Sequence, residues 1–275
     1  MLELTTLGGL SAAVDGVPLV GAAAQRSRLA LLTLLSRAGP KGISRDKVLA
    51  CFWPERDERH ARSALKQRIY ALRTDFGQDA ILGTSTLSVD PGFVRSDLLA
   101  FDSAIGRRDY AAAVAVYSGP FLDGVYLKGS AEFERWADQE RVRLSLAWSD
   151  AVERLAAECE RRRERRDAVV WWRVLATSEP LNGRLACSLA RALAESGDVA
   201  AALGHVKEHA AALRAELGIS PGSEIVALAA ALRDGSWRPA GHAGRAAGTE
   251  VLGEREGWKI DEATIGAAAG YAAVA

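Results

Sequence analysis

One amphipathic segment, residues 57–77, constrains the fold of this chain more than any other part of its sequence. Apolar side chains recur there every three or four residues, at Ala61, Leu65, Ile69, Leu72 and Phe76. This spacing predicts a helix with one buried stripe, which begins near Asp57 and stops at Gly77. The helix must therefore pack against a core along one face and expose its other face to solvent or to a binding partner.

The opposite face of this helix is cationic, with five basic and no acidic residues between Arg59 and Thr74. An α-helix fits the major groove of B-DNA, and its N-terminal half normally meets the base edges. We therefore predict that five side chains enter the groove: Arg59, Arg62, Ser63, Lys66 and Gln67. Tyr70 and Arg73 are predicted to lie nearer the DNA backbone.

The charge of the surrounding segment supports a polyanionic partner. The whole chain has no net charge, yet residues 26–73 carry twelve basic and four acidic residues, a net charge of +8. A neutral chain with one basic segment is typical of a local polyanion-binding surface, although a solvated charged face is the alternative. Auxiliary contacts to DNA are predicted for four cations, Arg26, Arg28, Arg45 and Lys47, in two shorter helices at residues 26–38 and 45–52.

The order of elements around these helices predicts a winged helix-turn-helix. Short strands are expected in the first twenty residues, with a hairpin turn at Asp15-Gly16. A second hairpin is expected around Gly83-Thr84-Ser85, where a wing would follow the third helix. Its tip is hydroxylic, so we expect backbone and hydroxyl contacts from it and no arginine in the minor groove.

From Ser96 onward the sequence is helical and rich in alanine. A long helix is expected from Ala131 to Arg165, and three similar segments at 108–117, 166–175 and 197–206 indicate tetratricopeptide-like helix pairs. The predicted fold class is an α+β winged helix-turn-helix domain followed by an all-α tetratricopeptide-like helical domain. The predicted boundaries are 1–95 for the winged helix, 96–238 for the helical domain and 239–275 for a flexible tail.

Other functions find little support in the sequence. No apolar run approaches the length of a membrane span, the three cysteines are far apart, and no secretory signal precedes the first strand, so a cytoplasmic protein is expected. No phosphate-binding GxxxxGK[ST] motif occurs, and the nearest string, at 248–255, lacks the lysine. His205 and His209 match a zinc-protease pattern, but we expect exposed histidines on a repeat helix instead, and we predict no cofactor, no metal and no enzyme.

Two further patterns can be interpreted either structurally or functionally, and we expect the structural role in both. Trp171-Trp172, with Trp136 and Trp148, are expected to fill the space between helices, the alternative being an aromatic ligand cage. The arginines of residues 161–166 alternate with glutamates, so ion pairs along a solvated helix are expected, the alternative being contact with DNA or polymerase.

Several ordered motifs resemble one known family. LTTLGGLSAAVDGVPL, QRSRLALLTLL, ISRDKVLACFWPE and ERHARSALKQRIYALRTDFG are similar to the N-terminal domain of the Streptomyces antibiotic regulatory protein family. RSDLLAFDSAI, YSGPFLDGVYL, EFERWADQERVRL, EPLN and ELGISPGSE resemble the bacterial transcriptional activator domain that follows it.

This resemblance, over about residues 2–235, implies a DNA-binding transcriptional regulator, usually an activator. The expected partners are double-stranded DNA, which such proteins bind as direct repeats near promoters, RNA polymerase, and a second copy of the chain in a homodimer on DNA; no membrane is expected. An NTPase module and an N-terminal receiver, which larger relatives carry, are not indicated. The alternative function is a tetratricopeptide-type protein-interaction adaptor without its own DNA specificity.

Overall fold

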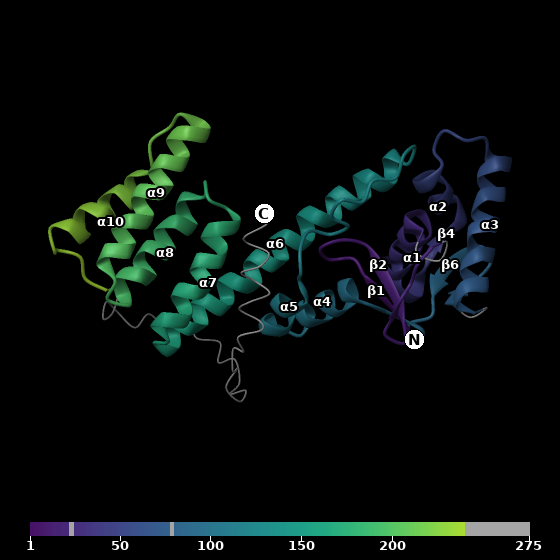
Figure 1. Cartoon of the computed structure of the whole chain (residues 1–275), viewed down its shortest axis with the longest axis horizontal. Helices are drawn as coiled ribbons and strands as arrows, with labels where there is room; N and C mark the ends of the chain where they lie inside the picture. Colours follow the sequence, from purple (N-terminus) through teal and green to yellow (C-terminus); the bar gives the residue numbers. More distant parts are fainter. Residues whose placement is uncertain (22–24, 78–79, 240–275) are drawn as a thin grey trace. The chain divides into compact units, whose positions relative to one another are not determined.

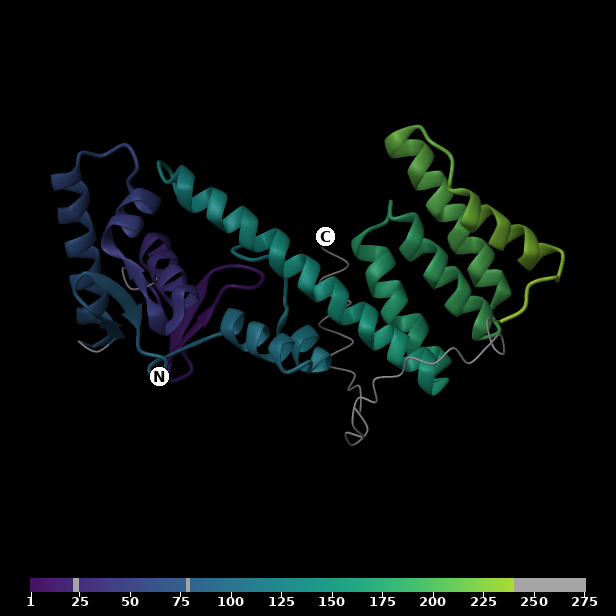
Figure 2. The same cartoon turned by 180° about the vertical axis from the view of Figure 1, so that it is seen from behind.

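The computed structural model describes residues 1–21, 25–77 and 80–239 (Figures 1 and 2). The predicted tail, apart from Pro239, lies outside the described residues, as does the string at 248–255. The chain divides into two compact units, the first unit from Met1 to Trp148 and the second unit from Ser149 onward.

The first unit begins with a small sheet. Its strands, in spatial order, are β3 (Val17–Pro18), β2 (Ser11–Val14), β1 (Leu2–Thr5) and β7 (Val94–Ser96). The hairpin predicted between β2 and β3 is confirmed, because Asp15 and Gly16 have φ of 48° and 79°, which a tight hairpin turn requires at both central positions. β7 returns along β1 in the parallel direction.

Three helices and a second sheet complete the winged helix-turn-helix. The helices are α1 (Arg26–Ala38), α2 (Arg45–Phe52) and α3 (Glu58–Phe76), each within a residue of its predicted range. A 3-10 turn (Gly39–Lys41) and β4 (Ile43–Ser44) connect α1 to α2.

β4 pairs with β6 (Thr86–Val89), which forms the predicted wing hairpin with β5 (Ile81–Leu82). The turn between β5 and β6 requires glycine, because a Cβ on Gly83 would lie 1.9 Å from the Thr86 carbonyl oxygen. The wing therefore has the hydroxylic tip that the sequence predicted.

The first unit also contains helices that follow β7. These are α4 (Asp97–Gly106), α5 (Tyr110–Val116) and the beginning of α6 (Ala131–Arg162). The prediction that the long helix continues to Arg165 was wrong, because Arg163 takes a left-handed conformation (φ 62°) and ends α6 three residues earlier. Trp148 is buried, as expected for a residue of the core.

The second unit consists of packed helices in addition to the end of α6. They are α7 (Arg165–Ser178), α8 (Gly183–Glu195), α9 (Val199–Leu217) and α10 (Ser223–Arg233). α8 packs against α7, α9 and α10, and Trp171 and Trp172 fill the space between helices as predicted. The predicted fold class, a winged helix-turn-helix followed by tetratricopeptide-like helices, is confirmed.

The two histidines of the zinc-protease pattern required a correction. They were expected to be exposed on a repeat helix, but His209 is only 3% exposed and His205 is half-buried, because this face of α9 packs on its neighbours. The His209 Nδ1 donates to the Pro180 carbonyl oxygen at 2.9 Å. Among the described residues, no three His, Cys, Asp or Glu side chains lie together as a metal site would require.

Candidate nucleic-acid interface

α3 is held in place by its apolar stripe and by a capped N-terminus. All five residues predicted for the stripe, Ala61, Leu65, Ile69, Leu72 and Phe76, are buried. At the start of the helix the Asp57 carboxylate accepts a hydrogen bond from the His60 backbone N–H at 3.2 Å. α3 lies at the margin of the first unit in both views, so its outer face is open to a partner (Figures 1 and 2).

The outer face of α3 is exposed as the sequence predicted. The exposed side chains are those of Arg59, Arg62, Ser63, Lys66, Gln67 and Tyr70. They combine three cations with a hydroxyl, an amide and a phenol, which are groups that bind phosphates or base edges. The five groove residues of the prediction therefore lie together on one surface, which we call the α3 outer face.

The cations of the α3 outer face differ in their local partners. The Arg62 Nη2 lies 2.5 Å from Glu58 Oε1, on the same helix, and 4.0 Å from Asp46 Oδ1 of α2. Within the described residues, Arg59 and Lys66 form no salt bridge. Exposed ion pairs contribute at most about 1 kcal/mol, so a phosphate can replace either acidic partner of Arg62.

Two arginines that were predicted to contact DNA have partners inside the first unit. Arg73 Nη2 donates to the Ile81 carbonyl oxygen at 2.8 Å, which joins α3 to β5. Arg28 Nη1 donates to Asp75 Oδ2 at 2.6 Å, which joins α1 to the end of α3. These bonds position α3, and a direct contact of either arginine with DNA stays a prediction.

The remaining predicted cations lie at the N-termini of α1 and α2. Arg26 and Lys47 are exposed, whereas Arg45 is half-buried. The Arg45 backbone N–H donates to the Ser85 carbonyl oxygen at 3.0 Å, and its Nε donates to the Thr84 carbonyl oxygen. Arg45 thus ties the N-terminus of α2 to the wing turn, a contact that the sequence did not predict because it joins residues 39 positions apart.

One arginine of α3 was missed altogether. Arg68 is half-buried on the flank of the helix, and its guanidinium lies over two aromatic rings. Its Cζ is 4.6 Å from the centroid of the Trp53 ring and 5.4 Å from the centroid of the Phe52 ring. Burial lowers the pKa of Arg68 to about 10, and the nearby Arg28 and Arg56 act in the same direction. The adjacent aromatic pair Phe52-Trp53, just before the turn, was the available signal.

Two arginines of the run at residues 161–166 form ion pairs on α6, as predicted. Arg161 Nη2 and Arg162 Nε both lie 2.6 Å from Glu158 Oε1. These pairs lower the pKa of Glu158 below its usual value, chiefly through the Arg161 hydrogen bond. Ion pairing within α6 therefore explains Arg161 and Arg162, and contact of the other arginines of the run with DNA or polymerase stays an alternative.

Comparison with known proteins points to transcription. A family model described as the bacterial transcriptional activator domain matches residues 96–233, half of the chain. No curated protein sequence matches the chain. Among the helices of the described residues, none is long and apolar enough to cross a membrane.

A solved structure is similar to most of the chain. It is that of Mycobacterium tuberculosis EmbR in complex with a low-affinity phosphopeptide, with a TM-score of 0.59 and 21% sequence identity. The similarity covers 85% of this chain and 65% of EmbR, so the chain spans less than two thirds of the EmbR chain. At this identity the likeness establishes the shared fold.

Proposed function

Because the chain belongs to the bacterial transcriptional activator domain family, we propose that it is a sequence-specific DNA-binding activator of transcription that reads the major groove with α3. The resemblance to the Streptomyces antibiotic regulatory protein family, in which a winged helix precedes that domain, is confirmed. The observation that carries the DNA-binding proposal is the α3 outer face, an exposed cationic surface on a helix whose other side is buried.

The chemistry of the α3 outer face suits both phosphates and bases. Arg59 and Lys66, which have no ion-pair partner among the described residues, supply charge for phosphates or for guanine O6 and N7. Ser63 and Gln67 lie on the same exposed face, and a glutamine amide can bond an adenine bidentately. Counterion release from the phosphates provides much of the affinity in this arrangement, so binding should weaken steeply with salt.

The wing contacts the DNA backbone next to the groove that α3 enters. Its turn offers the hydroxyls of Thr84, Ser85 and Thr86, and the bonds from Arg45 hold that turn against α2. Hydroxyls and backbone N–H groups bind phosphate oxygens without reading sequence. The wing therefore contributes register and affinity, and the α3 outer face contributes the choice of sequence.

Activation requires contacts beyond DNA. Following the family resemblance, we propose that two copies bind promoter repeats side by side, that the helical domain helps to recruit RNA polymerase, and that the protein acts in the cytoplasm. The packed helices α7–α10 offer the kind of surface with which tetratricopeptide-like domains bind proteins. The adaptor alternative uses this same surface and needs no DNA specificity, so DNA binding is the property that separates the two functions.

The decisive experiment is fluorescence anisotropy of the purified chain on DNA from upstream of its own gene, against an unrelated duplex of equal length. We expect tighter binding to the upstream DNA and a loss of at least about tenfold in the double variant Arg62→Glu/Lys66→Glu. The matched control, Lys207→Glu/Arg214→Glu, makes the same charge change on exposed positions of α9 and should bind as the wild type does.

Two results would overturn the proposal. Equal weak binding of both duplexes by the wild type would remove sequence specificity, and polymerase co-purifying with such a protein would favour the adaptor. An equal loss in both double variants would show that net charge, and not the α3 outer face, governs binding. Transcription from the upstream DNA with purified polymerase then tests activation, which should rise when the wild-type chain is added.

A further inference from the structure

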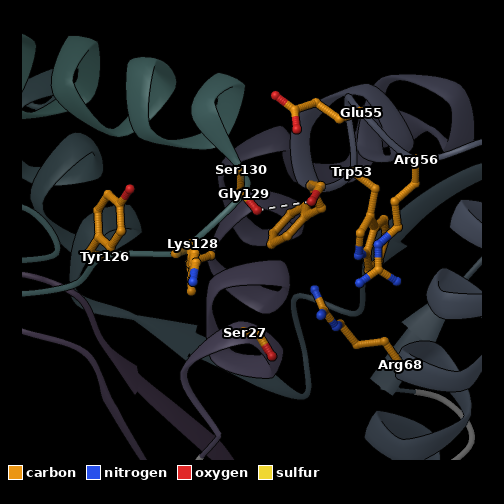
Figure 3. A pocket seen from close by; sticks show the side chains of 11 residues that line it. Ser27, Trp53, Glu55, Arg56, Arg68, Tyr126, Lys128, Gly129 and Ser130 are labelled. Carbon is orange, nitrogen blue, oxygen red and sulfur yellow. Dashed lines mark hydrogen bonds between the residues drawn. The ribbon is translucent and has the colours of Figure 1, made fainter.

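A polar cavity of about 370 Å³ lies in the first unit beside α3, away from the α3 outer face (Figure 3). Its walls come from the start of α1, the turn between α2 and α3, α3 itself, and residues 126–130, which precede α6. This volume falls within the range of pockets that bind small molecules. The segments that line it are far apart in sequence, so the cavity exists only in the folded first unit.

Arg68 is the unusual feature of this cavity. Its guanidinium is half-buried against Trp53 and Phe52, and among the described residues it forms no hydrogen bond or salt bridge. Partly buried charges are normally paired, because the loss of hydration is costly without compensation. The Arg68 nitrogen atoms point into the cavity (Figure 3), where an anion would supply the missing partner.

Two more cations line the same cavity, and neither is paired with an acidic side chain of the part of the chain that the structure describes. Arg56 and Lys128 are both lining residues, and neither forms an ion pair within the described ranges. Among the described residues that line the cavity, Glu55 alone is acidic, and its carboxylate is turned away from both guanidinium groups (Figure 3). The cavity is thus a concave cationic site with a hydroxyl, that of Ser27, at its edge.

The walls are held in place without a ligand. Ser130 Oγ donates to the Phe52 carbonyl oxygen at 2.9 Å, drawn as the dashed line in Figure 3. The Leu127 backbone N–H donates to Glu134 Oε1 at 2.6 Å. These bonds fasten residues 127–130 to α2 and α6, so little conformational entropy need be lost when the site is filled.

An aromatic ring at the rim of the cavity suggests that the ligand carries a flat group in addition to its anionic group. Tyr126 is 68% exposed and lines the cavity on the side opposite Trp53 (Figure 3). We propose that this cavity binds a small organic anion, with its phosphate or carboxylate group on Arg68, Arg56 and Lys128 and a flat group against Tyr126. Such a ligand touches the helix-turn-helix and residues 126–130 at once, so its binding stabilises the first unit as a whole.

The test is isothermal titration calorimetry of the full chain with two probes, inorganic pyrophosphate and adenosine monophosphate. We expect saturable binding of both, weakened about tenfold or more by Arg68→Gln, and likewise by Arg56→Gln on the exposed turn, in case the first variant folds poorly. Tyr126→Ala should weaken only the nucleotide, because pyrophosphate has no ring. Arg214→Gln, at an exposed position of α9, is the matched control and should bind both probes as the wild type does.

Two outcomes would overturn the proposal. One is the lack of saturable binding of either probe up to about 10 mM, a concentration that corresponds to a very weak site. The other is found with the upstream DNA: if Arg68→Gln reduces the salt dependence of DNA binding by about one phosphate contact, the anion in this cavity is the DNA backbone. An unchanged salt dependence together with lost probe binding supports a small ligand.

Discussion

Asp97 joins the first sheet to the helices that follow β7, and its removal should destabilise the first unit strongly. Its carboxylate accepts hydrogen bonds from the backbone N–H groups of Thr6 and Leu7, at 2.7 and 2.8 Å, and from the Thr6 hydroxyl at 2.6 Å. Thr6 is fully buried and Leu7 is 1% exposed, so water cannot easily take the place of the carboxylate. The variant to test is Asp97→Ala.

The expected loss follows from the groups that would be left without a partner. Each buried N–H or hydroxyl that loses its partner costs about 1–3 kcal/mol. With three such donors, and some relaxation around the hydroxyl, we expect the free energy of unfolding to fall by about 3–5 kcal/mol. Domains are stable by only about 5–15 kcal/mol, so this change is a large fraction of the total.

Urea denaturation followed by circular dichroism measures this loss. For a slope of about 2 kcal/mol per molar urea, the midpoint of the first unit should fall by about 2 M. The matched control is Asp109→Ala, which removes a single N-cap bond to the Ala112 backbone N–H and should cost about 1 kcal/mol. If Asp97→Ala costs no more than this control, the three bonds to the loop after β1 do not stabilise the fold as argued.

Further predictions concern DNA affinity, thiol reactivity and pH. Glu58→Gln should tighten DNA binding about two- to threefold, because it removes a negative charge beside the α3 outer face and frees its arginine partner; anisotropy showing weaker binding would contradict this. Lys66→Ala should cost about 1–3 kcal/mol in binding and relax the preference at one base, and a footprinting titration without change would exclude this lysine from the interface. Burial raises the pKa of Cys51 and of Cys159 to about 12, so iodoacetamide at pH 8 should modify them at least about 100-fold more slowly than in the urea-unfolded chain. Burial lowers the pKa of His205, so the folded state favours the neutral ring; the shift has no effect well above pH 6.5, and the free energy of unfolding falls as the pH drops below about 6.5, because the unfolded chain then binds the proton more readily. Thermal unfolding between pH 7.5 and 5.5 should show this loss in the wild type and less of it in His205→Gln, and equal pH dependence of the two would refute it.

The helices of the winged helix could be predicted because their signals are local. Ser44 and Asp57 are N-caps that accept hydrogen bonds from the third residue of α2 and α3, and Gly39 and Gly77 end α1 and α3 with positive φ. The apolar period then assigns the buried and exposed faces of α3 without reference to any other element. The composition of the α3 outer face followed from the same period.

Contacts between distant residues left no comparable signal. The parallel pairing of β1 with β7 joins strands about ninety residues apart, and either strand alone is too short to specify it. The break after α6 occurs at Arg163, an arginine in a left-handed conformation where glycine would be the usual marker. The pairing of Arg62 with Asp46 and the inward bond of Arg73 likewise depend on packing that spacing along one helix does not reveal.

The boundary between the predicted domains also shows that local sequence signals are easier to recognise than contacts between distant residues. The change in sequence character and the start of the matched family model both fall at residue 96, yet the first compact unit continues to Trp148. The reason lies in the loop after β1: the Gly8 backbone N–H donates to the Pro120 carbonyl oxygen at 3.0 Å, and the Leu122 N–H donates to the Thr6 carbonyl oxygen at 2.7 Å. α1 makes a further link through Arg37 Nε and Glu140 Oε2, 3.1 Å apart.

These links mean that residues 1–95 do not contain all the partners of their own buried polar groups. A fragment cut at the predicted boundary would lose Asp97, and with it the acceptor for the Thr6 and Leu7 N–H groups. It would also lose the Ser118 hydroxyl that donates to the Leu7 carbonyl oxygen at 2.5 Å. Buried backbone groups without partners are costly, so the helices α4 and α5 and the first half of α6 are part of what holds α1 and, through Arg28 and Asp75, the end of α3. The matched activator domain therefore begins inside the same compact unit that contains α3.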